Sequence, residues 1–245
     1  MPAPRLHVPL PMVQGQILSL PDTAARHVQV LRLQPGMPLV LFNGDGGEYA
    51  ATVQRMGRSE VEVAVGAFDP VERELRVEVT LALGMPANDR MDALVEKATE
   101  LGVAAIQPLV CERSVLRLAG ERADKRREHW QAIAVSASEQ SGRTRVPKVA
   151  SVQTLAAWTS ALPAHGQDER WLLSFSDDAL WPASRLAGTR LLVLSGPEGG
   201  LAPTEEQLAR EAGFRAVSLG DRVLRADTAP IAVLAFLGLS ALAAG

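Results

Sequence analysis

The chain has 245 residues, enough for one large domain or two modest ones, and 47% of them are hydrophobic. Such a composition can bury a core and excludes a disordered protein. The net charge of −3 gives no sign of a nucleic-acid partner. The single cysteine, Cys111, excludes an internal disulfide and is typical of a reducing compartment, so we expect a cytoplasmic protein.

The first seventy residues are predicted to form mostly strands. Turn-rich segments separate three short apolar runs, and this pattern predicts a β-meander that forms a small barrel. The runs are Pro38–Phe42, Glu48–Arg55 and Glu60–Val65. One helix is predicted from Asp22 to Leu33, with Asp22 as its capping residue. A domain boundary is predicted near Asp69-Pro70.

From Glu74 onwards, strands alternate with helices. The predicted strands are Leu75–Leu83, Ala104–Val110, Trp171–Phe175, Arg190–Leu194 and Ala216–Leu219. The predicted helices are Asp89–Leu101, Ala119–Ser141, Pro203–Ala212 and Ala229–Ala243. This alternation predicts an α/β fold with a parallel sheet that is covered on both faces. The last helix is apolar but shorter than the roughly 20 residues that span a bilayer, so we expect a buried helix and no membrane partner.

Positive charge gathers in one window of this acidic protein. Between Arg113 and Lys148 there are nine basic and four acidic residues, a local net charge of +5. Such a patch can neutralise phosphates, and it can equally be the solvated face of a helix.

Several common site motifs are absent. No G-x-G-x-x-G follows a strand, and neither a Walker A lysine motif nor a G-x-S-x-G turn occurs. The four histidines are scattered, so we expect no metal site.

Two segments of the last third have the composition of ligand-binding loops. In the first, an apolar strand runs into Ser195-Gly196-Pro197-Glu198-Gly199-Gly200 and then towards a helix. Ligands bind at the carboxyl ends of parallel strands, and glycines let the backbone approach them closely, so we favour a binding loop over a tight turn. In the second, Leu219–Arg225 leads into Ala226-Asp227-Thr228, and Thr228 could cap the following helix. Its charges either form an internal Arg–Asp bridge or serve a ligand, and Arg225 suits both.

Together with weaker segments, these motifs resemble one family: the bacterial small-subunit (16S) ribosomal RNA uridine-N3 methyltransferases of the SPOUT superfamily. The matching stretches span nearly the whole chain: Arg26-His27 to Leu33, Lys97 to Val103, Glu112-Arg113-Ser114, Glu139 to Arg143, Ser195 to Leu201 and Leu219 to Ala229. The resemblance implies an α/β protein with two domains. Residues 1–71 would form a PUA-like RNA-binding β-barrel, and residues 72–245 a SPOUT methyltransferase domain with a parallel sheet and a trefoil knot.

The resemblance also implies a homodimer that acts on 16S ribosomal RNA or the small ribosomal subunit, with S-adenosylmethionine as cofactor. The implied cofactor-binding residues are Leu173, Ser174, Leu194, Ser195, Gly196, Pro197, Glu198, Gly199, Gly200, Leu219, Gly220, Val223, Leu224, Arg225 and Thr228. The implied RNA-binding residues are Arg26, His27, Arg32, Arg113, Arg126, Arg127 and Arg143.

Methyl transfer from a sulfonium needs donor and acceptor in line and no covalent intermediate. The uridine N3 proton must leave, and Glu139, Glu198 and Asp227 are candidates to assist. Arg225 could stabilise charge on the uracil carbonyls. The family usually has glutamate where Asp227 stands, one methylene shorter, which changes the reach of the carboxylate.

Two other hypotheses fit part of the sequence. A related knotted methyltransferase could modify a ribose 2′-hydroxyl or another base. An RNA-binding assembly factor could keep the fold without binding the cofactor.

Overall fold

The protein is described by a computed structural model that covers residues 3–58, 60–87, 89–163, 168–181 and 189–242. The chain forms two compact units. The first contains Met1–Glu74 and Ser138–Val146, and the second contains Leu75–Ala137 and Pro147–Gly245. Each unit has a hydrophobic core of its own.

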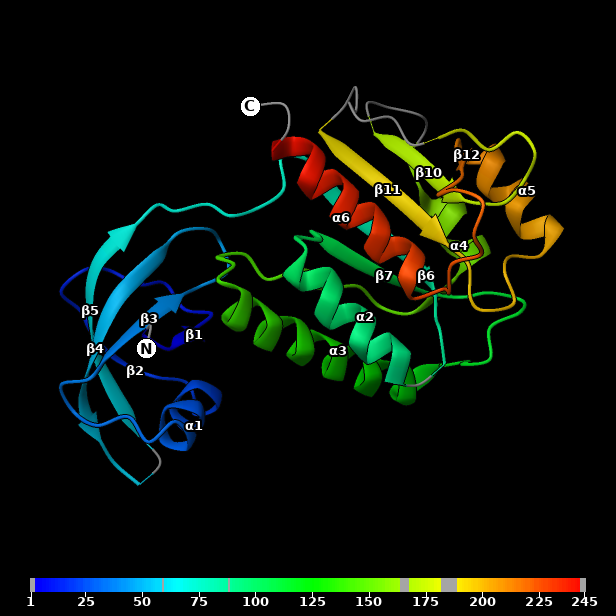
Figure 1. Ribbon diagram of the computed structural model, residues 1–245. Helices are drawn as coiled ribbons and strands as arrows, with labels where there is room; N and C mark the ends of the chain where they lie inside the picture. Colours follow the sequence, from blue (N-terminus) through cyan, green and yellow to red (C-terminus); the bar gives the residue numbers. More distant parts are fainter. Residues whose placement is uncertain (1–2, 59, 88, 164–167, 182–188, 243–245) are drawn as a thin grey trace. The chain divides into compact units, whose positions relative to one another are not determined.

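A curved sheet dominates the first unit (Figure 1). Its described elements are β1 (Arg5–His7), β2 (Ile17–Ser19), α1 (Asp22–Val30), β3 (Pro38–Phe42), β4 (Glu48–Met56) and β5 (Val61–Asp69). The strand order is β1-β3-β4-β5-β2, with β1 parallel to β3 and the other neighbours antiparallel. Alternate side chains, such as Leu39 and Leu41 of β3, are buried in the core. The predicted meander is confirmed, whereas β1 and β2 are too short to give a periodic pattern.

Helix α1 begins and ends differently from the prediction. Pro21 is the N-cap, and Asp22 is the first helical residue and makes no capping hydrogen bond. The helix stops at Val30 because Arg32 adopts a left-handed conformation, with φ of 54°. The Leu33 amide then donates to the Val28 carbonyl at 3.2 Å, which closes the last turn.

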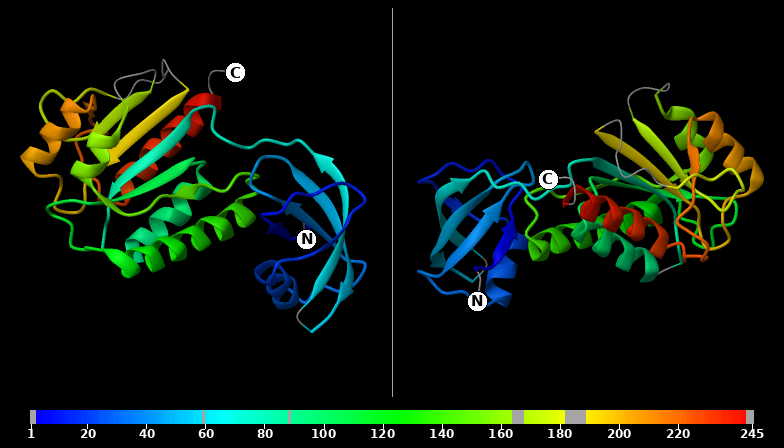
Figure 2. Two further views of the ribbon diagram at one scale, coloured as in Figure 1. Left: turned by 180° about the vertical axis from the view of Figure 1, so that it is seen from behind. Right: turned by 45° about the horizontal axis from the view of Figure 1, so that its top comes forward.

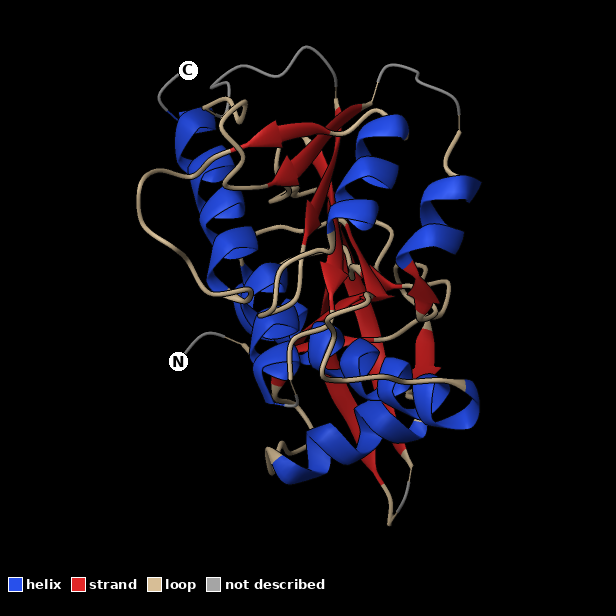
Figure 3. Ribbon diagram, turned by 90° about the vertical axis from the view of Figure 1, so that its right-hand side faces the viewer, coloured by secondary structure: helices blue, strands red, loops and turns tan. Residues whose placement is uncertain are grey.

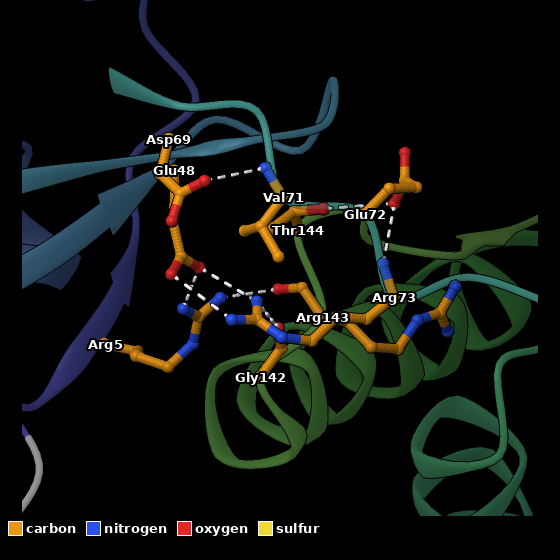
Figure 4. A network of polar contacts seen from close by, with 9 residues as sticks. All are labelled: Arg5, Glu48, Asp69, Val71, Glu72, Arg73, Gly142, Arg143 and Thr144. Atoms are coloured by element: carbon orange, nitrogen blue, oxygen red, sulfur yellow. Dashed lines mark hydrogen bonds and ion pairs between the residues drawn. The ribbon is translucent and has the colours of Figure 1, made fainter. Parts of the chain in front are cut away.

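A polar network ties Ser138–Val146 into the first unit (Figure 4). The Glu48 carboxylate pairs with the guanidinium groups of Arg5 and Arg73. These arginines also donate to backbone carbonyls, Arg5 to Arg143 at 2.9 Å and Arg73 to Gly142 at 2.8 Å. One partly buried carboxylate therefore pairs with two cations that hold a segment distant in sequence.

The second unit is built on a parallel sheet. Its described elements are β6 (Glu78–Gly84), α2 (Asp89–Glu100), β7 (Ala105–Val110), β8 (Lys148–Val149), β9 (Gln153–Thr154), α4 (Leu155–Ala161), β10 (Glu169–Leu173), β11 (Arg190–Ser195), α5 (Pro203–Glu211), β12 (Arg215–Val217), α6 (Thr228–Leu242) and most of α3 (Gly120–Ser141). The strand order is β12-β10-β11-β6-β7-β8, β9 also pairs with β7, and all these pairings are parallel.

Helices cover both faces of this sheet (Figures 2 and 3). Leu191 and Val193 of β11 pack in the core that contains residues of α2, α3 and α6. Leu194 packs in a second core with residues of α4 and α5. Since neighbouring residues of a strand point to opposite faces, the continuous apolar runs in the sequence follow from burial on both sides.

The predicted order of strands and helices in this unit is confirmed, with boundaries that shift by a few residues. The sequence prediction missed β8, β9 and α4, which are short. The implied trefoil knot stays a prediction. No helix in the described ranges is long and apolar enough to cross a membrane.

The sheet core sets the stability of the second unit. Leu81 of β6 is fully buried, so Leu81→Ala should lower the free energy of unfolding by about 2–5 kcal/mol. Leu180→Ala removes the same atoms from a side chain that is 57% exposed and should cost much less. All four tryptophans lie in this unit, so their fluorescence during urea unfolding measures both variants. Equal losses would contradict the proposed core.

The carboxylate of Glu48 should make the first unit sensitive to acid. Burial raises the pKa of Glu48, but the hydrogen bonds and charges of Arg73 and Arg5 outweigh burial and hold the pKa below its ordinary value. The folded state therefore gains stability from this group above the unfolded pKa, and loses it as pH falls through the lower folded pKa.

Glu48→Gln should therefore destabilise the first unit at pH 7, by about 2 kcal/mol. The difference from wild type should shrink below about pH 4, where the wild-type carboxylate protonates. Hydrogen exchange of the β4 and β5 amides at several pH values measures this. A difference that does not change with pH would argue against the network.

Candidate functional site

A cavity of about 780 Å³ lies in the second unit where β10, β11 and β12 end. The carboxyl ends of parallel strands are the usual ligand-binding edge of an α/β sheet. The cavity is lined by Arg90, Arg113, Leu173, Ser174, Phe175, Ser176, Ser195, Gly196, Pro197, Glu198, Gly199, Gly200, Leu201, Glu206, Val217, Leu219, Arg222, Val223, Leu224, Arg225, Ala226 and Ala229.

The β11 loop, Ser195–Leu201, forms one wall and packs closely on β6. A Cβ atom built on Gly84 would lie 2.5 Å from Pro197 Cδ and 2.6 Å from its nitrogen. Within the loop, the Gly200 amide donates to the Pro197 carbonyl at 2.8 Å, and Gly200 has φ of +68°. Glycine at 84 admits the loop, and glycine at 200 allows its turn.

Glu198 fastens the same loop to the start of α2. Its Oε1 accepts a hydrogen bond from the Ala87 amide at 3.0 Å and lies 3.6 Å from Arg90 Nη1. The carboxylate thus has two partners within the second unit.

The β7 turn, Cys111–Ser114, borders the loop from another side. The Arg113 Nη1 donates to the carbonyls of Gly199 at 3.1 Å and Leu201 at 3.2 Å. Burial, with a smaller contribution from the charge of Glu205, raises the pKa of the Cys111 thiol to about 12. A thiol held neutral in this way is not a nucleophile at neutral pH.

The β10 loop, Ser174–Leu180, is fixed to α5 by Arg210. The Arg210 guanidinium donates to both carboxylate oxygens of Asp178, at 2.7 and 3.0 Å, and to Ser176 Oγ at 3.0 Å. The hydrogen bonds from Arg210 and Ser176 lower the pKa of Asp178 to about 2. Because Ser176 lines the cavity, this contact also sets the shape of the cavity wall.

The β12 loop, Leu219–Arg225, brings cations to the cavity. Arg222 and Arg225 line it, and within the described ranges neither forms an ion pair with Asp221 or Asp227. The internal bridge considered for Arg225 is therefore not seen there. The Oδ1 atom of Asp227 is buried and has no hydrogen-bond partner in the described part of the chain.

The structure brings most of the predicted cofactor residues together around this cavity. The exceptions are Leu194, Gly220 and Thr228. Leu194 is fully buried against the second core, and Thr228 begins α6. Lining residues that the sequence analysis missed are Arg90, Phe175, Ser176, Leu201, Glu206, Val217, Arg222, Ala226 and Ala229. Most of these are direct neighbours of the predicted ones, but Arg90 comes from α2 and gave no signal in the sequence.

Glu139, a predicted catalytic residue, lies in the first unit. Its Oε1 accepts a hydrogen bond from the His7 amide at 2.9 Å, and its Oε2 lies 3.4 Å from His27 Nδ1. Burial raises the pKa of Glu139, against the lowering effects of His7, His27 and Arg5. Its carboxylate already has partners in the fold of that unit.

The predicted RNA-binding residues fall into different surroundings. Arg26 and Arg32 are exposed and His27 is partly exposed on or next to α1, while Arg126 and Arg127 are half-buried on α3. Arg113 lines the cavity. Arg143 is 3% exposed and pairs with Glu74. Burial removes Arg143 from the arginines that could meet a phosphate.

Comparisons with known proteins agree with this architecture. The family model of the RNA methyltransferase domain matches residues 73–238, and that of the RNA methyltransferase PUA domain matches residues 20–66. The ribosomal RNA small subunit methyltransferase E of Bacillus subtilis is 32% identical over 216 residues, which cover 84% of this chain and 83% of that protein. The protein of the same name from Mycobacterium bovis is 32% identical, over 90% of this chain and 89% of its own.

Two solved structures are also similar. A ribosomal RNA small subunit methyltransferase E from Neisseria gonorrhoeae, bound to S-adenosylmethionine, has 36% identity and a TM-score of 0.88, and the match covers 95% of each chain. A methyltransferase of Legionella pneumophila in complex with the same cofactor has 32% identity and a TM-score of 0.89, over 98% of each chain. The predicted fold, a PUA domain followed by an α/β methyltransferase domain with a parallel sheet, is confirmed. The chain therefore belongs to the ribosomal RNA small subunit methyltransferase E family of RNA methyltransferases.

Proposed function

We propose that this protein transfers a methyl group from S-adenosylmethionine to N3 of a uridine in 16S ribosomal RNA, and that it acts as a homodimer in the cytoplasm. The observation that carries the proposal is the cavity at the ends of β10, β11 and β12, with the glycine-rich β11 loop as its wall. Relatives named for the small-subunit ribosomal RNA, and a similar structure bound to S-adenosylmethionine, support the substrate and the cofactor.

The residues around the cavity fit the cofactor. The volume of the cavity lies within the roughly 300–1,000 Å³ that small-molecule sites usually have. Leu173, Val217 and Leu219 offer apolar contact, and the glycines of the β11 loop bring backbone to the cavity wall. When bound, S-adenosylmethionine supplies an electrophilic methyl group. The protein needs to align donor and acceptor, and the buried, neutral thiol of Cys111 is consistent with direct transfer.

The acceptor requires an unpaired uridine, because base pairing hides N3. We propose that Arg225 stabilises negative charge on the uracil carbonyls as the N3 proton leaves. Asp227 is the carboxylate that we propose for assisting that step, since its Oδ1 is unpaired within the described residues whereas Glu139 and Glu198 have partners.

Cations on both units are proposed to hold the RNA backbone. Arg26 and Arg32 are exposed in the first unit, and Arg122 and Lys125 are exposed on α3. Arg126 and Arg127, half-buried on the same helix, complete this set.

Exposed apolar side chains in the second unit support the homodimer. Val223, in the β12 loop, is 83% exposed, and Leu239, on α6, is 69% exposed. Burying large apolar side chains against a partner is favourable, and a second copy of the chain would bury them.

A measurement of cofactor binding distinguishes the methyltransferase hypothesis from that of an RNA-binding assembly factor that does not bind the cofactor. Wild type should bind S-adenosylhomocysteine in a calorimetric titration, and Gly199→Trp should not, because an indole at this position would collide with Arg113 and displace the β11 loop from the cavity wall. Gln207→Trp, which adds the same group to the exposed face of α5, should bind as wild type does. Absence of binding by wild type would favour the assembly factor.

Arg225 should matter for turnover more than for cofactor affinity. Arg225→Ala should lower kcat by about 100-fold or more and change the Kd for S-adenosylhomocysteine less than about threefold. Arg222→Ala removes an equal charge from the same loop and should have the smaller effect on kcat. Equal losses of kcat and cofactor affinity in Arg225→Ala would exclude the proposed role.

A further inference from the structure

We propose that Arg113 is a positioning residue that holds the β11 loop in its cofactor-binding shape, and that it is not an RNA contact. This role rests on the proposed function, because it assumes that the cofactor binds at this loop.

The contacts of Arg113 are directed at the loop backbone. Both hydrogens of Nη1 are used, since this one nitrogen donates to the carbonyls of Gly199 and Leu201 at 3.1 and 3.2 Å. The stem of the side chain packs on the same place: a Cβ atom built on Gly199 would lie 3.0 Å from Arg113 Cβ and 3.5 Å from its Cδ. The absence of a side chain at 199 therefore makes room for Arg113.

The β7 turn that carries Arg113 is itself held by hydrogen bonds. The Cys111 amide donates to Ser114 Oγ at 3.0 Å, and the Ser114 amide donates to the Cys111 carbonyl at 3.1 Å. Ser114 is only 6% exposed. The neighbouring amide of Glu112 donates to Glu205 Oε1 at 2.8 Å, while Glu205 Oε2 accepts from the Ala202 amide at 3.0 Å. One carboxylate thus joins the β7 turn to the end of the β11 loop.

These contacts of Arg113 are useful because the glycines leave the loop backbone free to adopt several conformations. Gly199 and Gly200 have no side chain to restrict them, and Gly200 adopts φ of +68°. If the loop samples several shapes, the apparent Kd rises in inverse proportion to the fraction that is competent to bind. By fixing the carbonyls on either side of Gly200, Arg113 raises that fraction.

The test compares two affinities in the full-length protein. Arg113→Met keeps the stem against Gly199 and removes the donors, so the Kd for S-adenosylhomocysteine should rise about tenfold while the Kd for a 16S ribosomal RNA transcript stays within about twofold. Arg113→Lys should restore cofactor affinity to within about threefold of wild type, because one ammonium can donate to both carbonyls. Arg122→Ala is the reciprocal control and should weaken RNA binding alone.

The outcomes separate the hypotheses. Unchanged cofactor affinity with weaker RNA binding in Arg113→Met would identify a phosphate contact and overturn the positioning role, and so would equal loss of both affinities. Failure of wild type to bind S-adenosylhomocysteine would instead overturn the proposed function, and the positioning role with it.

Discussion

Pro197 packs directly on the backbone of Gly84, and no side chain fits at position 84. This contact joins the β11 loop to β6, which lies next to β11 in the sheet. Because the loop follows a strand that is paired with β6 along its whole length, the sheet fixes the point at which the loop starts. The position of the cavity wall therefore depends on the register of β11 against β6, in which Ser195 pairs with Leu83.

Contacts with three further segments then hold the loop. Glu198 reaches the amide of Ala87, Arg113 reaches two loop carbonyls, and Glu205 of α5 receives the amide of Ala202. A glycine-rich segment is well suited to close approach by a ligand, but its freedom makes ordering costly. Anchors on several sides resolve that conflict, since the loop keeps bare backbone while its shape is set from outside.

Much of the fold was predictable because local patterns and tertiary packing agree. Long apolar runs such as Arg190–Leu194 match strands buried on both faces, and the glycine-rich loop between a strand and a helix matches the cavity wall. Contacts between distant segments were not predictable: nothing near Arg90 or Arg143 in the sequence indicates that the first lines the cavity and the second pairs with Glu74. A local cluster of arginines indicates charge but does not distinguish a phosphate contact from an internal one.

The central claim concerns the atom that is methylated. We would incubate the protein with 16S ribosomal RNA and isotope-labelled S-adenosylmethionine, digest the RNA to nucleosides and identify the labelled product by mass spectrometry. The proposed function predicts N3-methyluridine as the labelled nucleoside. Label in a 2′-O-methylated nucleoside, or in another base, would contradict it and indicate a different target for the same fold.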